Sequence, residues 1–162
     1  MWTAGAALLN DKIPASAALM NHALKAKPKD IKITESNQGS YGNIISKMKD
    51  SAEFADWVKK KTSGQACFDK SSGLFLADKG AVFTQITKDV FTAIGGTHQT
   101  GMVGCKTKAG TWELLITIKD VYDFKLKSYA KSSWPTWANN AGVISQFLGA
   151  ITPYNITMTF DY

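Results

Sequence analysis

The stretch Trp112-Glu113-Leu114-Leu115-Ile116-Thr117-Ile118 decides the fold of this chain. Its large apolar side chains recur at every second position, at Trp112, Leu114, Ile116 and Ile118. Successive side chains of a β-strand point to opposite faces of the sheet, so this alternation is typical of a strand with one buried face. We therefore predict a strand over residues 111–119 that packs one face on a hydrophobic core.

Further strands are predicted on both sides of this one. Residues 97–106 precede it across the turn sequence Thr107-Lys108-Ala109-Gly110, which favours a hairpin. A second hairpin is predicted from residues 74–77 and 81–86, and a closing strand from the alternation in Tyr154–Tyr162. Ile31 and Ile33 indicate a short edge strand.

Helices are predicted between these strands. Ser16 introduces a helix over Ala17–Ala26, which Pro28 follows. Asp50 and Glu53 form a D-x-x-E capping box for a helix that ends at Lys61, where three lysines complement the negative end of the helix dipole. The remaining helical segments are Ile44–Met48, Asp89–Ile94 and Pro135–Leu148.

The order of these elements predicts an α+β fold in a single domain, residues 1–162. We expect an antiparallel or mixed sheet of about five to six strands with about three to four helices packed on it. A chain of 162 residues is long enough to bury a sizeable core. No apolar stretch approaches the roughly 20 residues that a membrane-spanning helix requires, so we expect no transmembrane segment.

The positive charge of the chain is supplied by lysine alone. Nineteen lysines and no arginine stand against 13 acidic residues, which gives a formal net charge of +6. Because arginine is the usual bidentate ligand of guanine and phosphate, nucleic acid is the less favoured partner. The excess of lysine favours other anionic partners, namely phospholipid headgroups, a pyrophosphate substrate or an acidic protein, and it is also typical of a solvated surface.

Cys67 and Cys105 do not form a metal motif. Together with His22 and His98 they lack the spacing of zinc ligands, which excludes structural zinc. We expect each cysteine to be a small buried hydrophobe, with a disulfide between them as the alternative in an oxidising compartment. The sequence also lacks the P-loop, GxGxxG, HExxH and GxSxG motifs, which disfavours nucleotide-dependent and serine-hydrolase chemistry.

The densest polar cluster is Asp120-Val121-Tyr122-Asp123, which follows the predicted central strand. In an extended chain Asp120 and Tyr122 share a face, whereas a turn after Lys119 would bring both carboxylates together. Two close carboxylates can divide acid and base roles or bind Mg²⁺, and a tyrosine can donate to a developing oxyanion. We therefore predict Asp120, Tyr122 and Asp123 as catalytic residues, with Asp120 and Asp123 as Mg²⁺ ligands. A polar turn is the alternative.

Two histidines complete the set of predicted catalytic residues. His22 lies in the first predicted helix beside its apolar stripe, where half-buried packing is the alternative. His98 lies among Gly95, Gly96 and Thr97, a composition suited to a site loop.

Several short patterns resemble the C-terminal toxin domains of bacterial polymorphic toxins, which act in interbacterial antagonism. These patterns are Asp120–Phe124, Asn139-Asn140-Ala141, Gly149–Ile156, Leu19–Leu24 and Ser51–Phe54. The resemblance spans most of the chain at the level of short patterns. It implies an antibacterial effector that is secreted or delivered into target cells, acts in the periplasm or at the membrane, and is neutralised by an acidic immunity protein.

Within this class, the Asp120-x-Tyr122-Asp123 element and the later Gly149–Ile156 stretch are similar to the colicin M family of bacteriocins. That family cleaves a lipid-linked peptidoglycan precursor at its pyrophosphate in an Mg²⁺-dependent reaction. Its signature continues with a His-Arg pair, where this chain has Tyr129-Ala130. The resemblance implies hydrolysis of a lipid-linked or phosphate-bearing substrate. A membrane-active pore-forming toxin, a metal-dependent nuclease toxin and a plain binding module are the alternatives.

Overall fold

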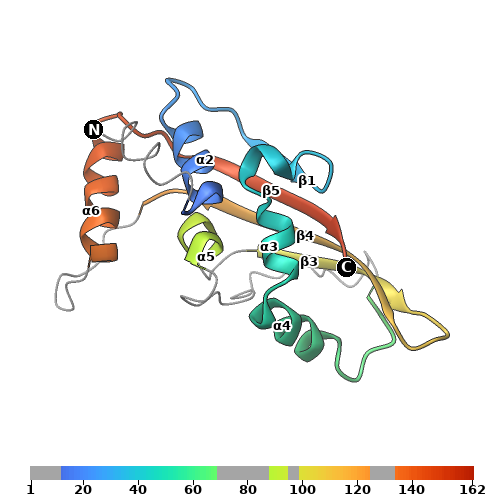
Figure 1. Cartoon of the computed structure of the whole chain (residues 1–162). Helices are drawn as coiled ribbons and strands as arrows, with labels where there is room; N and C mark the ends of the chain where they lie inside the picture. Colours follow the sequence, from blue (N-terminus) through green and yellow to red (C-terminus); the bar gives the residue numbers. More distant parts are fainter. Residues whose placement is uncertain (1–11, 69–87, 95–98, 125–133) are drawn as a thin grey trace.

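The computed structural model describes residues 12–68, 88–94, 99–124 and 134–162 (Figure 1). Five strands in these ranges form one sheet in the order β1-β5-β4-β3-β2. They are β1 (Ile31–Thr34), β2 (Cys67–Phe68), β3 (Gln99–Lys106), β4 (Trp112–Tyr122) and β5 (Tyr154–Asp161). β1 runs parallel to β5 and all other neighbours are antiparallel, so the sheet is mixed.

Five α-helices accompany the sheet in the described residues. They are α2 (Pro14–Ala23), α3 (Ile44–Lys49), α4 (Ala52–Thr62), α5 (Lys88–Ile94) and α6 (Trp134–Phe147), and a 3-10 helix, η1 (Gln38–Tyr41), precedes α3. In Figure 1, α2, α3 and α5 lie over one face of the sheet and α6 stands at one end of the molecule. The predicted α+β fold is confirmed. Among the described helices, none has the length and apolar character needed to span a membrane.

The core forms between the sheet and the helices that cover it. On β4 the predicted alternation is confirmed, since Leu114, Ile116 and Ile118 are at most 2% exposed. The facing side chains of β5 and of the helices are equally buried, among them Ile156, Met158, Leu19, Ile45 and Phe54. This apolar layer fixes which face of each strand points inward.

Two predicted helix starts were wrong. α4 is capped by Ser51, one residue after Asp50, and the Ser51 hydroxyl accepts a hydrogen bond from the Phe54 N–H at 3.3 Å. α2 begins at Pro14, so Ser16 lies inside the helix and does not introduce it. The predicted hairpin over residues 74–86 lies outside the described residues.

The outer edge of β1 is occupied by a side chain. The Asn37 Oδ1 atom accepts from the Thr34 N–H at 2.8 Å, and its Nδ2 atom donates to the Lys32 carbonyl at 3.0 Å. Residues two apart in a strand direct their backbone groups to the same side. The Asn37 amide therefore bonds to the two backbone groups that face away from β5.

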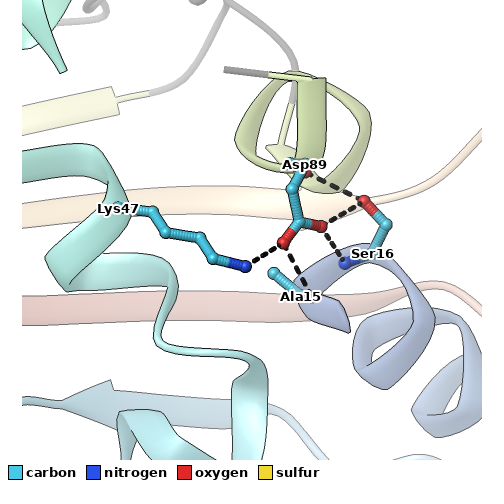
Figure 2. A network of polar contacts seen from close by, with 4 residues as sticks. All are labelled: Ala15, Ser16, Lys47 and Asp89. Carbon is cyan, nitrogen blue, oxygen red and sulfur yellow. Dashed lines mark hydrogen bonds and ion pairs between the residues drawn. The ribbon is translucent and has the colours of Figure 1, made fainter. Parts of the chain in front are cut away.

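Asp89 of α5 supplies the cap that α2 lacks (Figure 2). The N-cap residue of α2, Ile13, makes no side-chain cap. Instead the Asp89 carboxylate accepts from the backbone N–H groups of Ala15 at 3.1 Å and Ser16 at 3.0 Å. Lys47 of α3 forms an ion pair with the same carboxylate at 2.5 Å. One carboxylate, 9% exposed as a residue, therefore links three helices and satisfies N–H groups that are unpaired at a helix start.

We expect Asp89→Ala to lower the free energy of unfolding by about 2–4 kcal/mol, because it leaves two backbone N–H groups and the Lys47 ammonium without their acceptor. Urea denaturation followed by circular dichroism measures this. Glu35→Ala is the matched control, since Glu35 pairs with Lys49 of the same helix at 2.8 Å but its side chain is 44% exposed. The control is expected to cost less than about 1 kcal/mol, and equal losses would contradict the capping role.

Candidate functional site

The acidic motif lies inside and just beyond the end of β4. The strand continues to Tyr122, so the prediction that it ends at Lys119 was wrong and no turn follows Lys119. Asp120 is paired with Ile156 of β5 and Tyr122 with Tyr154. By the strand alternation, Asp120 and Tyr122 share the helix-covered face, while Asp123 follows the strand. Extended backbone separates the Cα atoms of the two aspartates by up to about 10 Å.

Tyr122 is the buried member of this motif. It is 8% exposed, and burial raises the pKa of its phenol far above the usual value because the charged form loses hydration. The phenol therefore stays protonated in the folded protein and can act as a hydrogen-bond donor. Asp120 and Asp123 are half-buried, and both residues have interaction partners.

Four aromatic rings form a continuous row that includes Tyr122 of the motif: they belong to His22 of α2, Tyr154 of β5, Tyr122 of β4 and Phe124, which follows β4. The ring centroids of His22 and Tyr154 lie 4.6 Å apart, those of Tyr154 and Tyr122 lie 5.4 Å apart in a stacked pair, and those of Tyr122 and Phe124 lie 5.7 Å apart. The structure thus brings His22 into the same cluster as Tyr122, through Tyr154. His98 lies outside the described residues.

The hydrogen bonds of His22 assign its two ring nitrogens. Its Nε2 atom lies 2.7 Å from the carbonyl oxygen of Lys29, and a carbonyl only accepts, so Nε2 carries the proton. Its Nδ1 atom lies 3.4 Å from the Lys25 ammonium. An ammonium only donates, so Nδ1 carries the lone pair and accepts from Lys25.

Tyr154 is a residue of this cluster that sequence reasoning did not single out. Its hydroxyl donates to the Leu19 carbonyl at 2.9 Å, which fastens β5 to α2. Burial and the neighbouring tyrosines raise the pKa of its phenol well above the usual range. The alternation of β5 places Tyr154 on the core face, but only the register between β4 and β5 sets it opposite Tyr122.

In the part of the chain that the structure describes, no three or more histidine, cysteine, aspartate or glutamate side chains gather into a metal site. Mg²⁺ keeps several waters and is commonly bound through one or two carboxylates. Asp120 and Asp123 carry the type of donor that this ion prefers, but three residues of extended chain separate them.

A second feature lies at the other end of β4. A hollow of about 580 Å³ opens between the end of α4 and the β3–β4 hairpin, and Lys59, Lys106, Trp112 and Tyr162 are among its lining residues. Eleven residues of β4 place it roughly 30 Å from Tyr122. Two lysines beside aromatic rings suit an anion with a planar or apolar part. From the sequence, Lys59 was predicted only as a partner of the helix dipole.

The cluster of Ser16, Lys47 and Asp89 has residue types found around serine nucleophiles, but its geometry is that of a helix cap. The Ser16 hydroxyl donates to the backbone carbonyl of Asp89 at 2.9 Å, and Ser16 is 5% exposed. The hydroxyl also lies 3.2 Å from Oδ1 of Asp89, but that carboxylate already accepts from the backbone N–H groups of Ala15 and Ser16 and pairs with Lys47. We assign this cluster to the folding of α2 and not to catalysis.

Cys67 and Cys105 form a disulfide between β2 and β3. They are paired in register on the two neighbouring strands, and both residues are exposed. The expectation that each cysteine is a buried free hydrophobe was therefore wrong. The sequence alone does not show that the two strands are neighbours, which is what brings the two sulfur atoms together.

Tyr122 and Tyr154 are expected to make the fold sensitive to alkali. A pKa that folding raises above the unfolded value of 10.0 contributes stability that is complete below pH 10 and falls as the pH rises further. Above pH 10, each buried phenol adds about 1.4 kcal/mol per pH unit to the rate at which the free energy of unfolding decreases. Urea denaturation at increasing pH measures this decrease in the free energy of unfolding. Tyr122→Phe should make the decrease smaller, because one ionisable buried phenol is removed. Ionisation of all five tyrosines in the folded state, seen by tyrosinate absorbance, would contradict this assignment.

No protein family, no curated protein and no solved structure matches this chain.

Proposed function

We propose that this chain is an antibacterial effector domain that acts in the envelope of competitor bacteria and hydrolyses a lipid-linked or phosphate-bearing substrate. The disulfide between Cys67 and Cys105 is the observation that supports action in the bacterial envelope. Disulfides form and persist in oxidising compartments such as the bacterial periplasm and are rare where thiols are kept reduced. Since both cysteines are exposed, reductants of a cytosol can reach the bond.

The charge of the chain supports the proposed partners. A net charge of +6 carried by lysine favours an anionic substrate and an acidic immunity protein that is drawn to the effector by its charge. Lysine binds phosphate as a mobile point charge and does not provide the rigid fork of arginine. An affinity for phosphate without base recognition fits a lipid-linked pyrophosphate better than a specific nucleic-acid sequence.

The proposed chemistry uses the end of β4 and the neighbouring helix. Asp120 and Asp123 are the proposed ligands of Mg²⁺, which would polarise a phosphoryl oxygen. The protonated phenol of Tyr122 is the proposed donor for charge that develops on the substrate, and Nδ1 of His22 is the proposed proton acceptor once Lys25 moves away from it. His98 remains a second proposed proton acceptor.

A metal-dependent nuclease is the second candidate. The lysine-lined hollow beside Trp112 favours it, since base stacking on an aromatic ring and phosphate contact by lysine are the usual means of holding single strands. That hollow lies at the opposite end of β4 from Asp120 and Asp123. A nuclease would therefore bind the nucleic acid in the hollow and cleave it at the distant end of β4.

Directing the chain to the periplasm of a susceptible bacterium is expected to stop growth, while cytoplasmic expression at the same level leaves growth unchanged. The double variant Asp120→Asn, Asp123→Asn should restore colony counts by at least about tenfold, because it removes the charge of both proposed Mg²⁺ ligands. The measurement is colony counting after induction, with protein level followed by immunoblotting.

Asp56→Asn is the matched control, because Asp56 is an exposed aspartate of α4 and lies apart from the motif. Toxicity that is absent in both compartments would overturn the effector proposal. Toxicity restricted to the cytoplasm, with EDTA-sensitive degradation of RNA or plasmid DNA by the purified protein, would favour the nuclease instead.

Replacing both cysteines, Cys67→Ser with Cys105→Ser, is expected to lower the free energy of unfolding by about 3–4 kcal/mol, since the bond closes a chain separation of 38 residues in the unfolded state. Urea denaturation of the oxidised and substituted proteins measures the difference. Adding dithiothreitol to the unsubstituted protein should produce a similar loss. No change on reduction would remove the main support for an oxidising compartment.

A further inference from the structure

The C-terminal end of α6 holds three large apolar side chains in solvent. Ile144, Phe147 and Leu148 are 57%, 89% and 72% exposed. Their spacing of three and four residues places them together on one side of the helix end. We call these three residues the α6 tip. Exposed clusters of large apolar residues mark sites of contact with a protein or a membrane.

The α6 tip is held outward by contacts on both sides of it. The side-chain oxygen of Gln146 accepts from the Phe124 N–H at 3.1 Å, which ties α6 to the end of β4. After the tip, Ile151 is 1% exposed and the Thr152 N–H donates to the Ala23 carbonyl at 3.0 Å. The three apolar side chains are therefore presented by a fixed piece of structure.

The backbone at the tip is already hydrogen-bonded. The N–H groups of Leu148, Gly149 and Ala150 donate to carbonyls of the last helical turn at 2.8–3.0 Å, and Gly149 adopts the left-handed conformation at φ 73° that this ending requires. Unpaired backbone groups strongly oppose transfer into lipid. These bonds pair the carbonyls of Ile144, Ser145 and Gln146, which a helix end can otherwise leave unpaired, and so reduce the cost of entering the interfacial layer of a bilayer.

The charges around the tip are complementary to an anionic surface. Residues 134–160, which include all of α6, contain no acidic, basic or histidine side chain. The bond from Thr152 to Ala23 brings this segment to the end of α2, where Lys25, Lys27 and Lys29 follow and are all exposed. Figure 1 shows the ends of α2 and α6 at the same end of the molecule. The acid of this loop, Asp30, is engaged by the backbone and side chain of Asn155.

We infer that the α6 tip inserts into the interfacial layer of an anionic bilayer while the three lysines after α2 contact its headgroups. Apolar insertion together with lysines at headgroup level is the standard means of peripheral membrane binding. Three side chains at a projecting helix end form a surface far smaller than the roughly 800 Å² per partner of a stable protein interface. The α6 tip includes none of the proposed catalytic residues, so loss of membrane binding through the tip can be told apart from loss of toxicity through Asp120 and Asp123. Lys25 contacts His22, so the lysine variant is used for membrane binding alone.

The test is flotation of the whole protein with phosphatidylcholine vesicles that contain or lack phosphatidylglycerol. The protein is expected to float with the anionic vesicles, and Phe147→Gln with Leu148→Gln should weaken binding at least tenfold. Replacing Lys25, Lys27 and Lys29 by Gln should abolish the preference for phosphatidylglycerol at low salt. These side chains are exposed, so the fold tolerates the changes, which circular dichroism verifies.

Two matched controls distinguish binding through the α6 tip and its neighbouring lysines from nonspecific binding through any exposed apolar side chain or any lysine. Leu115→Gln with Val121→Gln removes two apolar side chains that are 43% and 47% exposed on β4, and replacing Lys59, Lys60 and Lys61 by Gln removes three lysines at the end of α4. Both controls should bind like the unsubstituted protein. Equal loss in the controls, or no flotation with anionic vesicles, would overturn the inference. Dimerisation in solution that Phe147→Gln abolishes would assign the tip to a second copy of the chain instead.

Discussion

The carboxylate of Asp89 fixes the position of α2, and much of the molecule is arranged around that helix. A carboxylate placed at the first turn of a helix interacts favourably with the free N–H groups and with the positive end of the helix dipole. Here it comes from a residue more than 70 positions away and also pairs with Lys47. Gly42, which lies between η1 and α3, lets its own backbone approach the start of α2, because an added Cβ there would lie 2.4 Å from the backbone nitrogen of Ala15. The start of α2 is thereby set against α3 and α5.

The rest of α2 connects the contacts of Asp89 at its start with the candidate site. The Leu19 carbonyl accepts from the Tyr154 hydroxyl and the Ala23 carbonyl accepts from the Thr152 N–H, so α2 is tied to β5 and to the segment after α6. These bonds set the ring of His22 against Tyr154 and, through it, near Tyr122. They also place the exposed lysines after α2 beside the end of α6. A partly buried ion pair at one end of α2 thus supports both the candidate site and the surface formed by the lysines and the end of α6.

Local patterns in the sequence were sufficient for most of the secondary structure. Alternation predicted β4 and β5, and periodicity with capping residues predicted the helices, because these signals act over a few neighbouring residues. The start of α2 was missed since its cap is supplied by Asp89, which no local pattern reveals. The length of β4 was underestimated because Asp120 is a poor strand former, whereas pairing with β5 holds it in the strand. The disulfide and the pairing of Tyr122 with Tyr154 depend on register between strands, which also lies beyond local sequence.

The hydrogen bonds of Asn37 have a consequence for how molecules of this protein behave at high concentration. A free strand edge offers alternating donors and acceptors to any extended chain, and this is the usual starting point of cross-molecular sheet growth. Along β1, a side-chain amide already fills the donor and acceptor positions that an incoming strand would use. At the β1 edge, one asparagine therefore opposes the pairing of the sheet with a strand from another molecule.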